Sequence, residues 1–113
     1  MSRARVEAWL FVAQRASAAA LGVCVAVHLA TIVYAVRGGL TAAEILARTQ
    51  GSVALALFYG VFVLAVAIHA PIGLRAIFRE HLGWRGAALD AGVAIFAVLL
   101  VWLGWRALGG LFG

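Results

Sequence analysis

Three long apolar stretches dominate the pattern of hydrophobic and polar positions along the chain. They cover about residues 16–36, 52–78 and 86–107. Each reaches the ~20 residues that a helix needs to cross the ~30 Å hydrocarbon core of a bilayer. Backbone polar groups find no water in that core, so such stretches cross it as helices. The pattern predicts an all-α membrane protein, with a single transmembrane domain of three helices over residues 1–113.

The connections between these stretches carry stop and start signals. The segment RGGLTAAEILARTQG begins with a glycine pair that can stop a helix, and Thr41 followed by Glu44 resembles a capping box. We therefore expect a short surface helix between the first two spans. The segment REHLGWRG is a short charged turn, which predicts that the second and third spans are antiparallel neighbours.

An amphipathic segment precedes the first span. Over residues 3–13, one helical face collects Val6, Trp9, Leu10 and Ala13. This pattern is typical of a short helix that lies at the membrane interface, either separate from the first span or continuous with it.

The arginines predict the orientation, because the chain has no lysine. Six of them fall on one side of the predicted spans and three on the other, so the positive-inside rule favours a cytoplasmic N-terminus. The six are Arg3, Arg5, Arg15, Arg75, Arg79 and Arg85, and the three are Arg37, Arg48 and Arg106. Asp90, near the inner end of the third span, is expected to pair with Arg85 or Arg79.

Composition excludes several classes of protein. The chain is 66% hydrophobic and only 12% charged, and its mean hydropathy is +1.10, so a soluble fold of this size could not bury its apolar surface. Cys24 is the single cysteine, which excludes an internal disulfide and a cysteine-ligated cluster. The net charge of +5 is spread over span ends, and this pattern does not favour nucleic-acid binding.

His69 lies two to three turns inside the second span, where an ionisable side chain usually faces the bundle interior or a cofactor. At 100° per residue, small residues including Ala65, Gly73 and Ala76 share its face. They leave a flat recess that would suit a porphyrin ring, or else allow close approach of another helix. Pro71 is expected to bend the helix nearby.

His28 lies near the middle of the first span, and Ser17, Cys24 and Thr31 share its face. Histidine is a common axial ligand of haem iron, and burial keeps its imidazole neutral and able to bind. Two membrane histidines therefore suggest haem b, with His69 and His28 as candidate iron ligands. The alternative is that they form structural hydrogen bonds between helices. Whether both would bind one haem stays open, because their expected depths differ.

The segment HAPIGLRAIFRE, residues 69–80, looks like the signature His-x-x-x-Gly-Ile-Arg-His-x-x-x-Asp of a known family. That family comprises the cytochrome b membrane-anchor subunits of succinate dehydrogenase and fumarate reductase, the quinone-linked complex II enzymes. The matching positions here are His69, Gly73, Leu74, Arg75 and Glu80. The family also has Ser-x-x-His-Arg-x-Ser-Gly at the start of its first span, where FVAQRASA keeps Arg15 and Ser17.

The resemblance implies a role for each matching residue. His69 would be an axial ligand of haem b, beside Gly73, and Arg75 would contact a haem propionate or the quinone. Arg15 and Ser17 would line a quinone site. Arginines at span ends can instead anchor a helix at the lipid headgroups, and this reading stands beside the functional one.

This sequence also departs from the family pattern. Phe11 and Gln14 stand where the first motif has serine and histidine, and Ala76 replaces the histidine that follows the arginine. His28 is outside both motifs. It would be either a second ligand supplied by this chain or a structural histidine beside a partner's ligand.

The resemblance further implies a setting. The chain would be a multi-pass subunit of the bacterial inner (cytoplasmic) membrane, not catalytic on its own, in a quinone-linked oxidoreductase. It would hold an iron–sulfur subunit and a flavoprotein subunit, and would pass electrons between the iron–sulfur subunit and quinone. Three spans make a thin shell for a haem, so a second anchor chain or a homodimer is expected. The alternatives are a haem-free structural anchor or assembly subunit, and a small transporter, which the lack of internal repeats disfavours.

Overall fold

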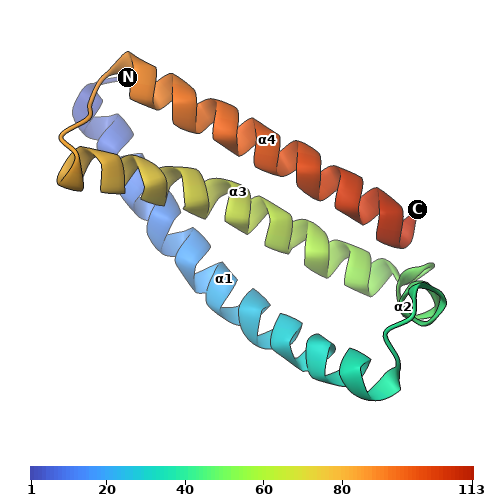
Figure 1. Cartoon of the computed structure of the whole chain (residues 1–113). Helices are drawn as coiled ribbons and strands as arrows, with labels where there is room; N and C mark the ends of the chain where they lie inside the picture. The colour runs from blue at the N-terminus through green and yellow to red at the C-terminus, as the bar shows by residue number, and fades with distance from the viewer.

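The computed structural model describes residues 1–113 and contains four helices and no strand. They are α1 (Arg3–Gly38), α2 (Ala42–Thr49), α3 (Val53–His81) and α4 (Ala87–Phe112). The helices α1, α3 and α4 are long and apolar enough to cross a membrane, which confirms the three predicted spans. Figure 1 shows α3 and α4 side by side and antiparallel, with α1 crossing behind α3.

Helix α1 is continuous from Arg3 to Gly38. Its 36 residues correspond to about 54 Å at ~1.5 Å per residue, well beyond the ~30 Å hydrocarbon core. Residues 3–13 form its first turns, so the predicted interfacial helix is not an element of its own. The helix stops at the expected glycine pair, where Gly39 has φ 115°, a conformation that glycine adopts without steric cost.

Helix α2 begins at the predicted cap. The Thr41 hydroxyl oxygen accepts a hydrogen bond from the Glu44 backbone N–H at 3.2 Å and donates its proton to Glu44 Oε1 at 2.7 Å. At the other end of α2, the Thr49 hydroxyl donates to the carbonyl oxygen of Leu111 at 2.7 Å. That bond ties α2 to the end of α4, so this short helix closes one end of the bundle.

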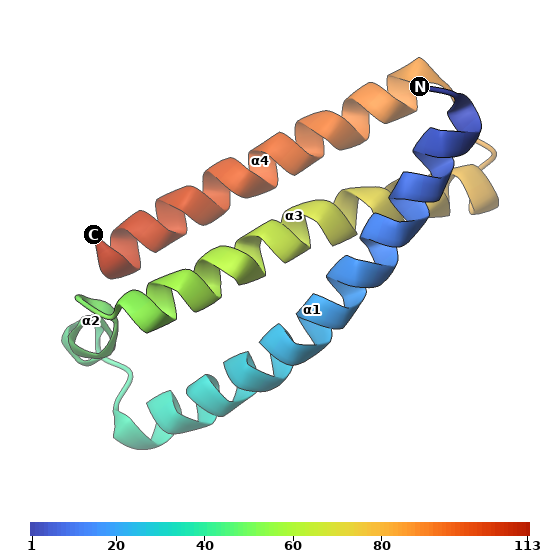
Figure 2. The same cartoon turned by 180° about the vertical axis from the view of Figure 1, so that it is seen from behind.

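Helices α3 and α4 pack closely along their length, as the short turn between them predicts (Figure 2). Gly104 permits this approach, because a Cβ there would overlap the side chain of Val63. Small residues play this part in membrane bundles, where lipid is as apolar as the side chains and close packing holds helices together. Helix α3 runs through Pro71 without interruption.

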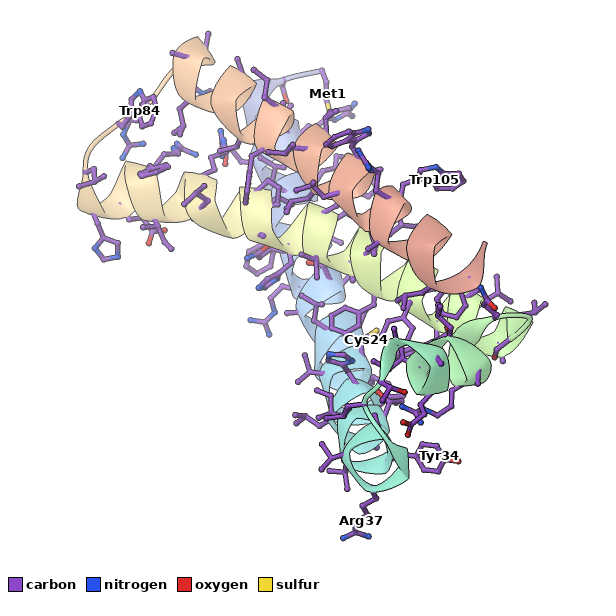
Figure 3. The ribbon with its side chains drawn as sticks, turned by 45° about the vertical axis from the view of Figure 1, so that its right-hand side comes forward. Met1, Cys24, Tyr34, Arg37, Trp84 and Trp105 are labelled. Atoms are coloured by element: carbon purple, nitrogen blue, oxygen red, sulfur yellow. The ribbon has the colours of Figure 1, made fainter.

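Few side chains are buried within the chain itself. The buried residues include Ser17, Cys24, Ala65, Ala67 and Leu89, and most large apolar side chains face outward. Figure 3 shows Trp105 directed away from the bundle, and Trp105 is 75% exposed. Such a surface suits a lipid environment, in which apolar side chains need not be hidden.

Candidate functional site

The two motif regions meet where α1 crosses α3. Ser17 of α1 is 5% exposed, and its Oγ lies 3.4 Å from Nδ1 of His69 on α3. The Ser17 hydroxyl also donates a hydrogen bond to the Gln14 carbonyl oxygen at 3.0 Å. One residue from each motif, 52 positions apart in the chain, is thereby brought into direct contact.

The recess beside His69 is filled by Gln14. A Cβ at Gly73 would lie 3.1 Å from Gln14 Nε2, so glycine is what lets the amide approach this closely. The Gln14 Oε1 atom is buried and has no hydrogen-bond partner within the chain. A buried acceptor without a donor is costly, so the Gln14 amide is a locally unfavourable feature of this crossing.

His28 lies in a separate hydrogen-bonded group further along the same two helices. Its Nδ1 is 3.1 Å from the hydroxyl oxygen of Tyr59 on α3, and that oxygen is 3.0 Å from Oγ1 of Thr31. The Thr31 hydroxyl donates to the His28 carbonyl oxygen at 2.7 Å. Phe62 packs edge-on against the imidazole, with ring centroids 5.5 Å apart.

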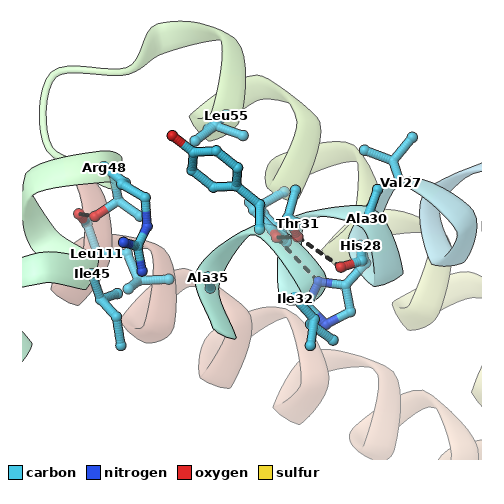
Figure 4. Close-up of a pocket in the computed structure, with 13 residues that line it drawn as sticks. Val27, His28, Ala30, Thr31, Ile32, Ala35, Ile45, Arg48, Leu55 and Leu111 are labelled. Atoms are coloured by element: carbon cyan, nitrogen blue, oxygen red, sulfur yellow. Dashed lines mark hydrogen bonds between the residues drawn. The ribbon is translucent and has the colours of Figure 1, made fainter. Parts of the chain in front are cut away.

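A cavity of about 660 Å³ adjoins this group, between α1, α2, α3 and the end of α4. Most of its wall is apolar, and Figure 4 shows His28 and Thr31 together on one side, with Arg48 of α2 on another. The polar groups that line it are His28, Thr31, Tyr34, Arg48, Thr49 and Tyr59.

The two histidines lie at different levels of the bundle. Ser17 marks the level of His69 on α1, and it is 11 positions, or about 16 Å at ~1.5 Å per residue, from His28. On α3, Tyr59 marks the level of His28 and is about 15 Å from His69. Metal–imidazole bonds are about 2 Å long, so the two rings of one chain cannot share one iron.

An ion-pair network joins the three long helices at the end nearest His69. Arg75 of α3 donates through Nε to Asp90 Oδ1 at 2.8 Å. It also donates through Nη1 and Nη2 to the Glu7 carboxylate at 3.2 and 2.8 Å, and Arg79 Nη1 reaches Glu7 Oε1 at 3.0 Å. The expectation that Asp90 pairs with Arg79 or Arg85 is wrong. Asp90, in the first turn of α4, lies level with Arg75, which is one helical turn further from the connecting loop than Arg79.

Arg15 and Ser17 face different directions. Ser17 is buried at the crossing, whereas Arg15 is exposed and its guanidinium lies 5.9 Å from the centre of the Phe11 ring. Two positions on a helix differ by about 200°, so the structure does not bring this pair together within the chain. A cavity of about 390 Å³ lies on another face of α1, where Gln14, Arg75, Arg79 and neighbouring side chains line it.

Residues 1–105 match the model of the succinate dehydrogenase/fumarate reductase transmembrane subunit family. The chain belongs to this family. No curated protein and no solved structure matches it. The resemblance to this family is thereby confirmed, and the chain is a multi-pass membrane-anchor subunit of that family.

The donor set of this transmembrane subunit fits a haem. No group of three or more His, Cys, Asp or Glu side chains is gathered anywhere in the chain, but a haem iron takes only axial ligands from protein. His69 and His28 each face the α1–α3 interface, and each leaves Nε2 without a hydrogen bond in the chain. His28 additionally borders a large, mainly apolar cavity.

The contacts of two residues of the transmembrane subunit were not predicted from the sequence. Glu7 lies among the basic residues of the N-terminal segment. Its negative charge was the only sign in the sequence that it would pair with the arginines near the end of α3. Tyr59 is one tyrosine in an apolar span, and only the crossing of α1 and α3 places it against His28. The pairing of distant helices is what local sequence patterns cannot supply.

Proposed function

We propose that this chain binds haem b and holds the iron–sulfur and flavoprotein subunits of its complex at the cytoplasmic face of the bacterial inner membrane. It transfers electrons between the iron–sulfur subunit and membrane quinone. The observation that carries the proposal is the contact between Ser17 and His69, which unites residues of both family motifs at one buried point. The haem supplies one-electron chemistry when bound.

The residues of the chain have distinct parts in this proposal. His69 is an axial ligand, and Gly73, which has no side chain, admits the Gln14 amide beside it. His28 is an axial ligand at the other level of the bundle, next to the 660 Å³ cavity. Because the two rings are about 15 Å apart along the helices, they serve different haems, and each iron takes its second ligand from a second anchor chain or a second copy.

Arg75, Arg15 and Ser17 lie towards the end of the bundle that we place on the cytoplasmic side. Arg75 uses three of its five N–H groups on Glu7 and Asp90, so one hydrogen on each Nη remains for a propionate or a quinone. Arg15 is exposed, and its quinone contact would therefore lie on the outer side of α1, away from Ser17. The guanidinium fork suits a carboxylate or a quinone carbonyl.

A haem-free structural anchor is the second candidate. Its support is that both histidines already make hydrogen bonds between α1 and α3, as structural histidines in membrane helices do. In that case the imidazoles hold the two helices in register and bind no cofactor.

A reduced-minus-oxidised spectrum of the purified complex, with pyridine-haemochrome quantification, separates the two candidates. We expect a b-type signal in the wild type, and loss of one haem component in His69→Ala and of another in His28→Ala. His81→Ala is the matched control, because His81 is exposed at the end of α3 and should leave the haem content unchanged. A wild-type complex without a b-type signal would support the structural anchor.

A further inference from the structure

Both membrane histidines are bonded to a hydroxyl group whose proton is already engaged elsewhere. At His69, the Ser17 hydroxyl has one proton and donates it to the Gln14 carbonyl oxygen at 3.0 Å. With its proton on that carbonyl, the Ser17 oxygen accepts from the imidazole nitrogen 3.4 Å away. It follows that Nδ1 of His69 carries the hydrogen, and that Nε2 of the neutral ring keeps a free lone pair.

The group around His28 favours the same tautomer through a chain of three hydrogen bonds. The Thr31 hydroxyl donates to the His28 carbonyl oxygen at 2.7 Å, so its oxygen accepts from Tyr59 at 3.0 Å. Tyr59 has then used its only proton and must accept from His28 Nδ1 at 3.1 Å. If Tyr59 donated to His28 instead, Thr31 would have to turn its proton from the His28 carbonyl oxygen, the shorter contact at 2.7 Å, to the Tyr59 oxygen at 3.0 Å.

We infer that Ser17 and the Thr31–Tyr59 pair are positioning residues, which hold His69 and His28 with hydrogen on Nδ1 and Nε2 free to bind haem iron. This inference rests on the proposed function. Metal-binding histidines commonly donate their other ring N–H to a fixed acceptor, which sets the tautomer, orients the ring and makes the ligating nitrogen more basic. Here the acceptors are hydroxyl oxygens, that of Ser17 on α1 for His69 and that of Tyr59 on α3 for His28.

A merely structural hydrogen bond would make a different prediction. If Ser17 only ties α1 to α3, its loss would lower stability but leave the electronic properties of a bound haem unchanged. A more basic ligand stabilises the oxidised iron, so removing the acceptor should raise the midpoint potential. The midpoint potential therefore distinguishes a residue that positions the histidine ligand from one that only holds α1 against α3.

The test at His69 uses Ser17→Ala and Ser17→Thr in the complete, purified complex. We expect Ser17→Ala to raise the midpoint potential of one haem component in a spectroelectrochemical titration. We also expect it to speed release of that haem to apomyoglobin by about 10- to 100-fold, the usual cost of losing such a partner. Ser17→Thr keeps a hydroxyl group and should restore both properties.

The test at His28 uses Tyr59→Phe, which removes one oxygen atom, with Tyr34→Phe as its matched control. Tyr34 lines the same cavity but does not contact His28. Tyr59→Phe should shift the potential and the release rate of the other haem component, and Tyr34→Phe should shift neither. This variant also decides the question at the second site if the Ser17→Ala complex fails to assemble.

The outcomes distinguish this inference from the proposed function. Haem present at wild-type potential and release rate in both Ser17→Ala and Tyr59→Phe overturns the inference but leaves haem binding intact. A Ser17→Thr complex shifted as far as Ser17→Ala also overturns it, because packing would then be the cause. A wild-type complex that contains no haem overturns both the inference and the proposed function.

Discussion

The two ends of the α1–α3 interface are held by different chemistry. Near His69, charged side chains of all three long helices form one network around Arg75, whose side chain is only 13% exposed. Around His28, the contacts are neutral, between imidazole, phenol and hydroxyl groups, and a large cavity adjoins them. Charges are costly deep in a bilayer, whereas paired charges at a helix end can draw on water and headgroups.

This difference indicates what each end is built to do. The ion pairs of the charged end tie α1, α3 and α4 together, and Leu89, next to Asp90 in the chain, is the most buried side chain. The neutral end leaves space beside His28 and is closed by the short helix α2. The same pair of helices thus offers one compact histidine site and one open one, and the following substitutions test that contrast.

Arg75→Ala should have the largest effect, because it breaks the charged network. It leaves the Glu7 and Asp90 carboxylates, which are 37% and 54% exposed, without their main partner. Because solvent screens them in part, we expect the free energy of unfolding to fall by about 2–3 kcal/mol, less than for a fully buried pair. Denaturation of the chain purified in detergent would measure this. Arg106→Ala is the matched control, since Arg106 only lies over the Trp102 ring at 5.3 Å. Equal losses in the two variants would contradict a special role for the network.

Leu89→Ala tests how tightly the charged end is packed. Leu89 is 1% exposed, and truncation leaves a cavity that costs about 2 kcal/mol, at the low end for leucine because lipid is itself apolar. Leu57→Ala is the control near the open end, where the side chain is 67% exposed and we expect almost no change. The same denaturation experiment compares the two, and a similar loss for both would remove the contrast in packing.

Gly104→Ala tests the α3–α4 contact that both ends share. The added methyl group would overlap the Val63 side chain, and overpacking of this kind costs about 1–2 kcal/mol. Gly109→Ala, where a Cβ meets nothing within 4 Å, should be neutral or slightly stabilising. Thermal unfolding of the two variants would measure the difference, and an unaffected Gly104→Ala would show that this contact is loose.

Thr41→Ala should have the smallest effect, confined to the open end. It removes the cap of α2, at a cost of about 0.5–1 kcal/mol, and should speed hydrogen exchange in residues 42–49. Thr41→Ser retains the hydroxyl and should exchange at the wild-type rate. Faster exchange throughout α3 as well would mean that α2 supports the whole bundle.

Much of the fold could be predicted from local patterns. The three spans, the short helix with its Thr41 cap and the antiparallel neighbours all follow from apolar length, capping residues and a short charged turn. These features are local, since a membrane helix satisfies its backbone within one segment. The family also followed from the sequence, because His69, Gly73 and Arg75 stand close together in one helix.

Tertiary structure decided which distant residues meet. The pairing of Asp90 with Arg75, the place of Glu7 in that network and the contact of His28 with Tyr59 depend on where α1 and α4 cross α3. It also decided that the two histidines stand about 15 Å apart. Crossing points are set by the packing of small side chains against each other over the whole bundle. The sequence by itself determined the helices and the groups they carry, and only the packed structure determined which of those groups touch.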